Sequence, residues 1–388
     1  HKPSHEVARR LLAQRCVPGP SARGVRHHTA SLLPGAPQSE AMPELGKADR
    51  AFFDEYIYPH LGADRDDVSL GPQHGVDFGV VDVGGRAVAM ATDPIFVMPA
   101  VGFERAAWFA FHILVSDVAV SGMPPTHLSV DFNLPPEITD EQFRTVWKTF
   151  DREATDLGVS IVTGHTARYA GCNYPMVGGA TALSVGDHDD LVRPDGAQVG
   201  DRIVVTKGPA IEATGLLSIQ FEALMDGAVA EDDIAAAQDR FHDMSPVRDA
   251  LTAAAAGPVS AMHDATEGGV HGGLYEMARA ADVAIEIERD RVPVQPGVEA
   301  ACAFFDIDPW ISISEGTLLA SVPEEGVDAV LDALAGEGIP AADVGRVVEA
   351  ESADRRLVVD GDPVAHPGKD PFWAAFEEHM GKLEQLEE

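Results

Sequence analysis

The sequence predicts two domains, one α/β and one α+β, behind a short N-terminal extension. Short apolar runs bounded by Gly and Pro alternate with amphipathic segments through both halves of the 388 residues, a pattern typical of sheets covered by helices. A turn-rich stretch, RPDGAQVGD at 193–201, separates the halves. We therefore place the domains at 42–192 and 193–352, followed by a strand and an acidic helix over 353–388.

Residues 1–41 differ in composition from the rest of the chain. They hold six basic residues, two acidic residues and four histidines, and they show no sustained apolar periodicity. We expect a disordered basic extension, or an upstream stretch that follows from a mis-assigned start. A functional basic arm is the alternative.

The first domain is predicted to begin with two strands, VDFGVVDVGG and RAVAMATDPI, which meet at the glycine pair 84–85. An almost wholly apolar helix follows over 104–121, and a helix that is apolar all round is usually buried. After the strand THLSVDFNLP, Thr139 and Gln142 form a capping box for a helix that ends at Gly158. The strands VSIVTG and MVGGATALSVG complete this domain.

The second domain repeats the mixture. Its strands are predicted in RIVVTKG, VAIEIE, GTLLASV and RRLVVD, and its helices run to about residue 256 and then over 269–281 and 326–335.

The charge of the chain excludes several classes of function. There are 63 acidic and 28 basic residues, a formal net charge of -35, and the acids are spread over every segment. This is typical of a surface adapted to high salt, where screening removes self-repulsion, and it predicts a halophilic protein. It also argues against nucleic acid, whose affinity depends on Lys and Arg. No apolar run is long enough for a membrane span, and no secretory signal is present, so we expect a cytoplasmic protein.

The cysteines and histidines do not form a recognised metal-binding motif. Cys16, Cys172 and Cys302 are far apart and no CxxC exists, as in a reducing compartment, and we expect Cys172 and Cys302 to be packed apolar groups. Zinc is not expected, because none of the five candidate histidines pairs with another at the i, i+4 spacing of HExxH. The histidines considered for it are His74, His112, His165, His263 and His271.

One carboxylate stands out because it lies inside the apolar helix. Asp117 is flanked by ILVS and VAVSG, and a buried unpaired carboxylate is normally protonated, paired or bound to a metal. Asp77 and Asp93 lie near the ends of predicted strands, and three carboxylates brought together would suit Mg²⁺. The alternative is that each aspartate caps a turn or pairs with arginine.

Other candidates would bind an anion. Lys207 is one of few lysines and lies beside glycines, which suits a phosphate contact, although an exposed turn lysine is the alternative. Glu212 is a further candidate. His263 and Asp264 open a loop that leads to the glycine pair 268–269 and a helix, where N–H groups bind anions. Helix capping by Asp264 or Thr266 is the alternative.

Three stretches, in this order, carry a family resemblance. SDVAVSGMPP is similar to N-D-L-A-V-M-G-A-x-P, HDATEGGVHGGLYEMA to H-D-P-T-x-G-G-L-x-x-x-L-x-E-x-A, and SEGTLLA to N-E-G-x-L-x-A. The chain resembles the AIR synthase (PurM) superfamily from about residue 70 to 350, and within it the HypE-like hydrogenase-maturation proteins.

That resemblance implies an N-terminal domain that forms a dimeric β-barrel with its twin, a C-terminal α+β domain whose mixed sheet is covered by helices, and ATP in the cleft between them. It implies that Asp77, Asp93 and Asp117 bind Mg²⁺ and the phosphates. Val76 stands where the family often has a second acid, which leaves the number of metal ions open. The catalytic residues implied are Asp93, Asp117 and Lys207. The nucleotide-binding residues implied are Gly75, Asp77, Asp93, Asp117, Gly164, His165, Thr166, Lys207, Asp264, Thr266, Gly268, Gly269 and Glu315.

The reaction that the resemblance implies is activation of an oxygen by ATP. HypE itself activates a carboxamide oxygen on its C-terminal cysteine, whereas this sequence ends in GKLEQLEE and its last cysteine is Cys302. We therefore expect an ATP- and Mg²⁺-dependent enzyme that phosphorylates a small-molecule or partner-borne carbonyl or amide. The alternatives are a phosphotransferase similar to thiamine-phosphate kinase, a non-catalytic nucleotide-binding scaffold for maturation, and a true AIR synthase, whose D-G-V-G-T-K signature is absent.

Overall fold

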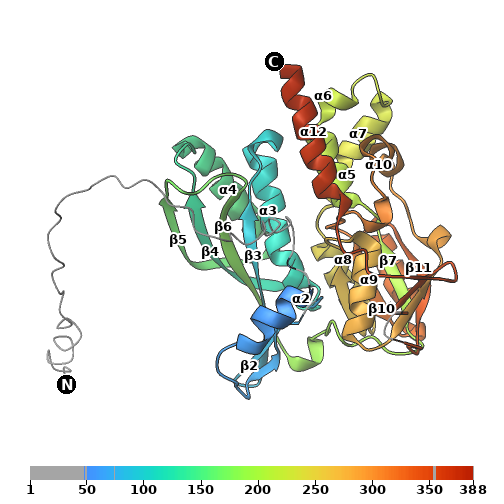
Figure 1. Ribbon diagram of the computed structural model, residues 1–388. Helices are drawn as coiled ribbons and strands as arrows, with labels where there is room; N and C mark the ends of the chain where they lie inside the picture. The colour runs from blue at the N-terminus through green and yellow to red at the C-terminus, as the bar shows by residue number, and fades with distance from the viewer. Residues whose placement is uncertain (1–47, 49, 74, 353–354, 388) are drawn as a thin grey trace, which may run out of the picture. The chain divides into compact units, whose positions relative to one another are not determined.

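A computed structural model of the chain describes residues 48, 50–73, 75–352 and 355–387 (Figure 1). The predicted extension 1–41, with Cys16, and the candidate His74 lie outside the described residues. Within the described part, two mixed sheets are present, one on either side of the predicted junction at 193–201. The domain limits themselves stay a prediction.

The first sheet has six strands in the order β1-β2-β3-β6-β4-β5, and only β4 and β5 run parallel. The predicted glycine turn at 84–85 joins β2 to β3 and is confirmed. The sheet is open, with β1 and β5 at its edges. Its strands are β1 (Val68–Leu70), β2 (Gly79–Val83), β3 (Arg86–Phe96), β4 (Pro125–Leu134), β5 (Ser160–Arg168) and β6 (Met176–Gly186).

Two helices pack on this sheet, as the sequence predicts. Helix α3 (Phe103–Ala119) contacts β3 and β6, and most of its side chains are buried because almost none of its faces is polar. Helix α4 (Asp140–Leu157) begins at the capping box of Thr139 and Gln142 and ends at Gly158, so both predicted ends are confirmed. Helix α3 also contacts α8 of the second half.

The second sheet has seven strands in the order β13-β12-β9-β11-β7-β10-β8, and only β12 and β9 run parallel. Its strands are β7 (Arg202–Thr206), β8 (Ala261–Asp264), β9 (Ala284–Ile287), β10 (Leu318–Val322), β11 (Ala341–Val348), β12 (Leu357–Val359) and β13 (Asp362–Val364). The helices of this half are α5 (Ile211–Gln220), α6 (Glu222–Met225), α7 (Glu231–Asp239), α8 (Val247–Ala256), α9 (Gly269–Ala280), α10 (Val298–Phe305), α11 (Val327–Gly336) and α12 (Pro371–Glu387).

Some elements were not predicted. Strand β11 was missed because AADVGRVV has few strand-forming residues in its first half. It forms because Gly345 lets the backbone of β9 approach: a Cβ at this position would lie 2.0 Å from the carbonyl oxygen of Glu286. His263 and Asp264 were expected to open a loop. They lie instead at the end of strand β8. None of the described helices is both long and apolar enough to cross a membrane.

Candidate functional site

Four aspartates from separate elements converge, and we call them the aspartate cluster: Asp77, Asp93, Asp117 and Asp264. Asp117 comes from α3, Asp93 from β3 and Asp264 from the end of β8, while Asp77 precedes β2. Ligand atoms of Asp77, Asp264 and His263 all lie within 4.8 Å of one another. The structure therefore brings together the three predicted metal ligands and adds Asp264 to them.

The cluster explains how Asp117 is tolerated in an apolar helix. The pKa of Asp117 is raised well above its usual value, first by burial and then by the negative charges of Asp93, Asp264 and Asp77. Carboxylates this close cannot all ionise without a cation among them. The aspartate cluster therefore shares protons when no cation is bound, and it is predisposed to bind one.

His263 holds the cluster from one side. Its Nδ1 lies 2.6 Å from Asp77 Oδ2 and its Nε2 lies 3.4 Å from Glu276 Oε2. Burial by itself lowers the pKa of His263, but the two carboxylates outweigh it and hold the pKa well above its usual value. A protonated imidazole donates to both carboxylates and does not ligate a metal. Sequence reasoning missed Glu276, although the E of the YEM segment in the quoted family motif marks this position.

Gly75 allows the loop before β2 to pack closely against Glu276. Its φ is +78°, and a Cβ there would lie 2.9 Å from Glu276 Cβ. Glycine is needed because the loop before β2 passes directly over α9. Its predicted role in nucleotide binding stays a prediction.

Two glutamates lie next to the cluster. The pKa of Glu212 is raised to about 8, mainly by burial, and that of Glu315 is raised well above its usual range by burial and by Asp264. The Glu315 N–H donates to Glu212 Oε2 at 3.2 Å, while Glu315 Oε1 is buried without a hydrogen-bond partner among the described residues. Glu315 was predicted to bind the nucleotide, and that role stays a prediction. Glu212, the further candidate for an anion contact, lies next to it.

We expect Glu212 to make stability fall as pH rises. Between its ordinary pKa of 4.5 and about 8, the folded state keeps a proton that the unfolded state has released, so each pH unit favours unfolding by up to about 1.4 kcal/mol. The stabilisation is complete below pH 4.5 and lost above pH 8. Glu212→Gln should lower the slope by this share and leave the parts due to Asp117 and Glu315, whereas exposed Glu222→Gln should retain the full slope. Urea unfolding at pH 6 and 8 with EDTA measures the difference, and equal slopes for wild type and Glu212→Gln would contradict the assignment.

The glycine pair before α9 is used within the protein. The Gly268 N–H donates to Asp370 Oδ2 at 2.8 Å, and the Gly269 N–H donates to the Thr266 carbonyl. A Cβ at Gly269 would lie 2.5 Å from the Ser312 carbonyl oxygen, so glycine is required for packing. This differs from the expected anion cradle, because the two N–H groups already have acceptors. Asp370, which sequence reasoning missed, lies too far along the chain for a local pattern to reveal it.

Gly164, His165 and Thr166, which the family resemblance implies as a turn near the nucleotide, lie in β5. All three are exposed on an edge strand, and His165 Nε2 pairs with the Tyr169 hydroxyl at 2.9 Å. In the sheet register, Asp93 is separated from Gly164 by β6 and β4, which is roughly 14 Å at the usual strand spacing. Within one chain they do not join the aspartate cluster.

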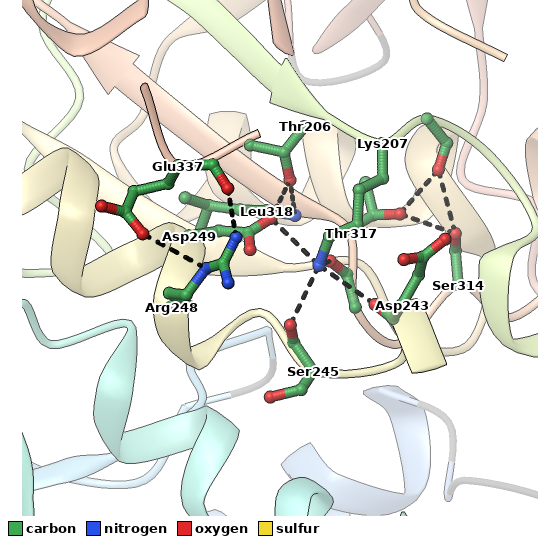
Figure 2. Close-up of polar contacts among 12 residues, drawn as sticks. Thr206, Lys207, Asp243, Ser245, Arg248, Asp249, Ser314, Thr317, Leu318 and Glu337 are labelled. Atoms are coloured by element: carbon green, nitrogen blue, oxygen red, sulfur yellow. Dashed lines mark hydrogen bonds and ion pairs between the residues drawn. The ribbon is translucent and has the colours of Figure 1, made fainter. Parts of the chain in front are cut away.

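Lys207 is a buried structural lysine (Figure 2). Its Nζ donates to the carbonyl oxygens of Asp243, Ser245 and Gly316 at 2.9–3.0 Å and lies 3.1 Å from Asp249 Oδ2. Neither the predicted phosphate contact nor an exposed lysine fits this geometry, because the three N–H bonds of an ammonium already have protein acceptors.

The donor set of the aspartate cluster fits Mg²⁺, which prefers carboxylate oxygens over nitrogen. Asp77, Asp93, Asp117 and Asp264 supply such oxygens, and the unpaired Glu315 Oε1 adds one nearby. Neither cysteine in the described part of the chain belongs to this donor set. Cys302 is buried and its pKa is raised to about 12, as expected for a packed residue, while Cys172 is half-buried.

Comparison with protein families gives two adjoining matches. Residues 75–191 match the AIR synthase related protein, N-terminal domain, and residues 198–357 match its C-terminal domain. The chain is 29% identical over 280 residues to carbamoyl dehydratase HypE of Rhizobium leguminosarum bv. viciae, covering 71% of this chain and 77% of the relative. It is 30% identical over 249 residues to HypE of Rhodobacter capsulatus, covering 63% and 70%.

Solved structures show the same fold. A crystal structure of hydrogenase maturation protein HypE in complex with ATP matches with a TM-score of 0.61 and 25% identity, covering 84% of this chain and 96% of that one. The structure of AaThiL complexed with AMPPCP and TMP matches with a TM-score of 0.59 and 21% identity, covering 75% and 89%. The second likeness concerns the fold alone.

Proposed function

Because the chain belongs to the AIR synthase-related family, we propose that it is an ATP- and Mg²⁺-dependent enzyme that phosphorylates an oxygen. The acceptor would be a carbonyl or amide of a small molecule or a partner protein. The observation that carries the proposal is the aspartate cluster, in which burial and the charges of three neighbouring aspartates raise the pKa of Asp117. HypE and AaThiL were solved with ATP and with an ATP analogue, which supports ATP as the phosphoryl donor.

The chain's own residues would position the reactants. Asp77, Asp93 and Asp117 would hold Mg²⁺, which supplies positive charge to the phosphates. His263 keeps the Asp77 carboxylate in place. Glu212, whose pKa is about 8, carries a proton at neutral pH and could exchange it with an acceptor oxygen.

The proposal is tested by titrating wild-type protein with ATP in a calorimeter, with and without Mg²⁺, and by following ADP release. Molar KCl is used because the net charge of -35 predicts a halophilic protein. We expect Mg²⁺-dependent binding and slow ADP release. Binding without ADP release would favour the non-catalytic maturation scaffold, acceleration by thiamine monophosphate would favour the kinase-like alternative, and absence of ATP binding would refute the proposal.

We further propose that two chains associate through strand β5. This edge strand exposes its backbone and Val162, which is 56% exposed, and an open strand edge readily pairs with another. Such pairing would also supply the barrel that the family resemblance implies, and would bring Gly164, His165 and Thr166 to a partner chain.

A charge on this edge should prevent association. Val162→Lys is expected to weaken the dimer at least about tenfold, because the ammonium would be buried without a partner. Val199→Lys is the matched control, since Val199 is 61% exposed and lies in the junction between the sheets. Sedimentation in molar KCl measures both. A wild-type monomer, or a Val162→Lys dimer as stable as wild type, would contradict the model of pairing through β5.

A further inference from the structure

A second group of reactive side chains lies outside the aspartate cluster. Ser245, His112 and Glu153 form a continuous hydrogen-bonded chain. The Ser245 hydroxyl lies 2.8 Å from His112 Nδ1, and His112 Nε2 lies 3.3 Å from Glu153 Oε2. With the ring proton on Nε2, the hydroxyl donates to the imidazole and the imidazole donates to the carboxylate. That is the order of a nucleophile, a general base and an orienting acid.

Each member is held by a different element. His112 comes from α3 and Glu153 from α4, and Ser245 lies just before α8. The His112 ring packs against Trp108, with 4.3 Å between ring centroids. Hydrogen bonds from His112 and from Arg152 lower the pKa of Glu153 against the effect of burial, so Glu153 remains an acceptor. The side chains of His112 and Glu153 are only 10% and 12% exposed, which limits competition from water.

The buried lysine fixes the nucleophile. Lys207 Nζ donates to the backbone carbonyl oxygens of Asp243 and Ser245 (Figure 2). Helix α8 begins two residues after Ser245, and the N–H groups of its first turn have no acceptor within the helix. The N–H groups of Val247 and Arg248 are therefore candidates to stabilise an oxyanion formed beside Ser245.

A cavity gives a substrate access to the serine. Its volume is about 800 Å³, and both Ser245 and His112 line it. Other serines in the described residues behave differently: Ser116 and Ser184 are fully buried and donate to backbone carbonyls. Ser245 is half-buried and its hydroxyl is hydrogen-bonded to an imidazole instead. A serine hydroxyl whose only role is to hydrogen-bond one structural element to another would not need to line a cavity.

The cavity wall defines the substrate. It is mainly apolar, and its charged members, Arg248 and Glu337, pair with each other. The remaining lining is Leu157, Val247, Leu251, Thr252, Ala255, Ala256, Ala333 and Gly336. An uncharged ester with a short apolar acyl group fits both the wall and a volume typical of ligand pockets.

We propose that this cavity is a second active site, which hydrolyses small apolar carboxylic esters. Ser245 Oγ bonds to the ester carbonyl carbon while its proton passes to His112. The C–O bond to the alcohol then breaks, and the alcohol leaves with that proton. Water, deprotonated by His112, displaces the acyl group from Ser245 as a carboxylic acid and restores the serine. Glu153 is a positioning residue that orients the imidazole.

The test uses the full chain, p-nitrophenyl butyrate and a fluorophosphonate probe, with peptide mass spectrometry to locate the probe. We expect wild type to hydrolyse the ester above the buffer rate and to be labelled at Ser245. Ser245→Ala should lose about 100-fold or more of the activity and the label. Glu153→Gln should lower kcat at least about tenfold with KM little changed, which a purely structural role would not produce. Ser260→Ala, outside the cavity, should keep both activity and label.

Labelling of the wild-type protein at Ser245 tests the proposal even if Ser245→Ala fails to fold, because the labelling experiment needs no variant. Wild type that neither hydrolyses the ester nor takes the probe at Ser245 would overturn the proposal. So would a folded Ser245→Ala that hydrolyses the ester at the wild-type rate. Neither outcome bears on ATP binding at the aspartate cluster.

Discussion

Asp117→Asn is expected to reduce ATP turnover by about 100-fold or more, because it removes a charge that would hold the metal and phosphates in the transition state. The same substitution should stabilise the protein when no metal is present. It removes one of four crowded carboxylates, and relief of like-charge repulsion is a common origin of such trade-offs between stability and function. ADP release and thermal melting measure the two effects separately.

Mg²⁺ provides a readout that does not depend on activity. Added Mg²⁺ should raise the melting temperature of wild type and have little effect on Asp117→Asn, because only the intact cluster gains by binding it. Asp156→Asn on α4 is the matched control, since that aspartate is exposed and should behave as wild type in both assays. Unchanged ADP release by Asp117→Asn would remove Asp117 from the metal site.

Lys207→Met should destabilise the fold by about 3–5 kcal/mol, the usual cost of removing one partner of a buried ion pair. The Asp249 carboxylate would lose its cation, and the carbonyls of Asp243, Ser245 and Gly316 would lose a shared donor. Urea unfolding measures the loss. Exposed Lys148→Ala should change the free energy of unfolding by no more than about 0.5 kcal/mol.

A double variant separates the structural role of Lys207 from phosphate binding. Lys207→Met with Asp249→Asn should recover part of the lost stability, because the neutral amide no longer needs a cation. If Lys207 instead contacts phosphate, Lys207→Met would weaken ATP binding and leave the free energy of unfolding nearly unchanged. That result would restore the role predicted from the sequence.

Local patterns in the sequence revealed much of the fold. The capping box at Thr139 and the glycine pair 84–85 were located correctly because each depends on residues within a few positions. The apolar surroundings of Asp117 were enough to indicate a carboxylate that needs a partner. Its convergence with Asp77 and Asp93 was implied by the family resemblance, whereas the residues alone left open that each aspartate caps a turn or pairs with arginine.

What the sequence by itself determined, then, is the buried helix, most strands and three of the four converging aspartates. Only the tertiary structure decided the partners of Lys207, which lie up to 109 positions away, and the pairing of His263 with Asp77 across 186 positions. The same holds for the chain from Ser245 to His112 and Glu153, which joins three elements. Apolar periodicity and capping act over a few residues, whereas a buried charge or hydroxyl takes whichever acceptor the packed chain brings within hydrogen-bonding distance.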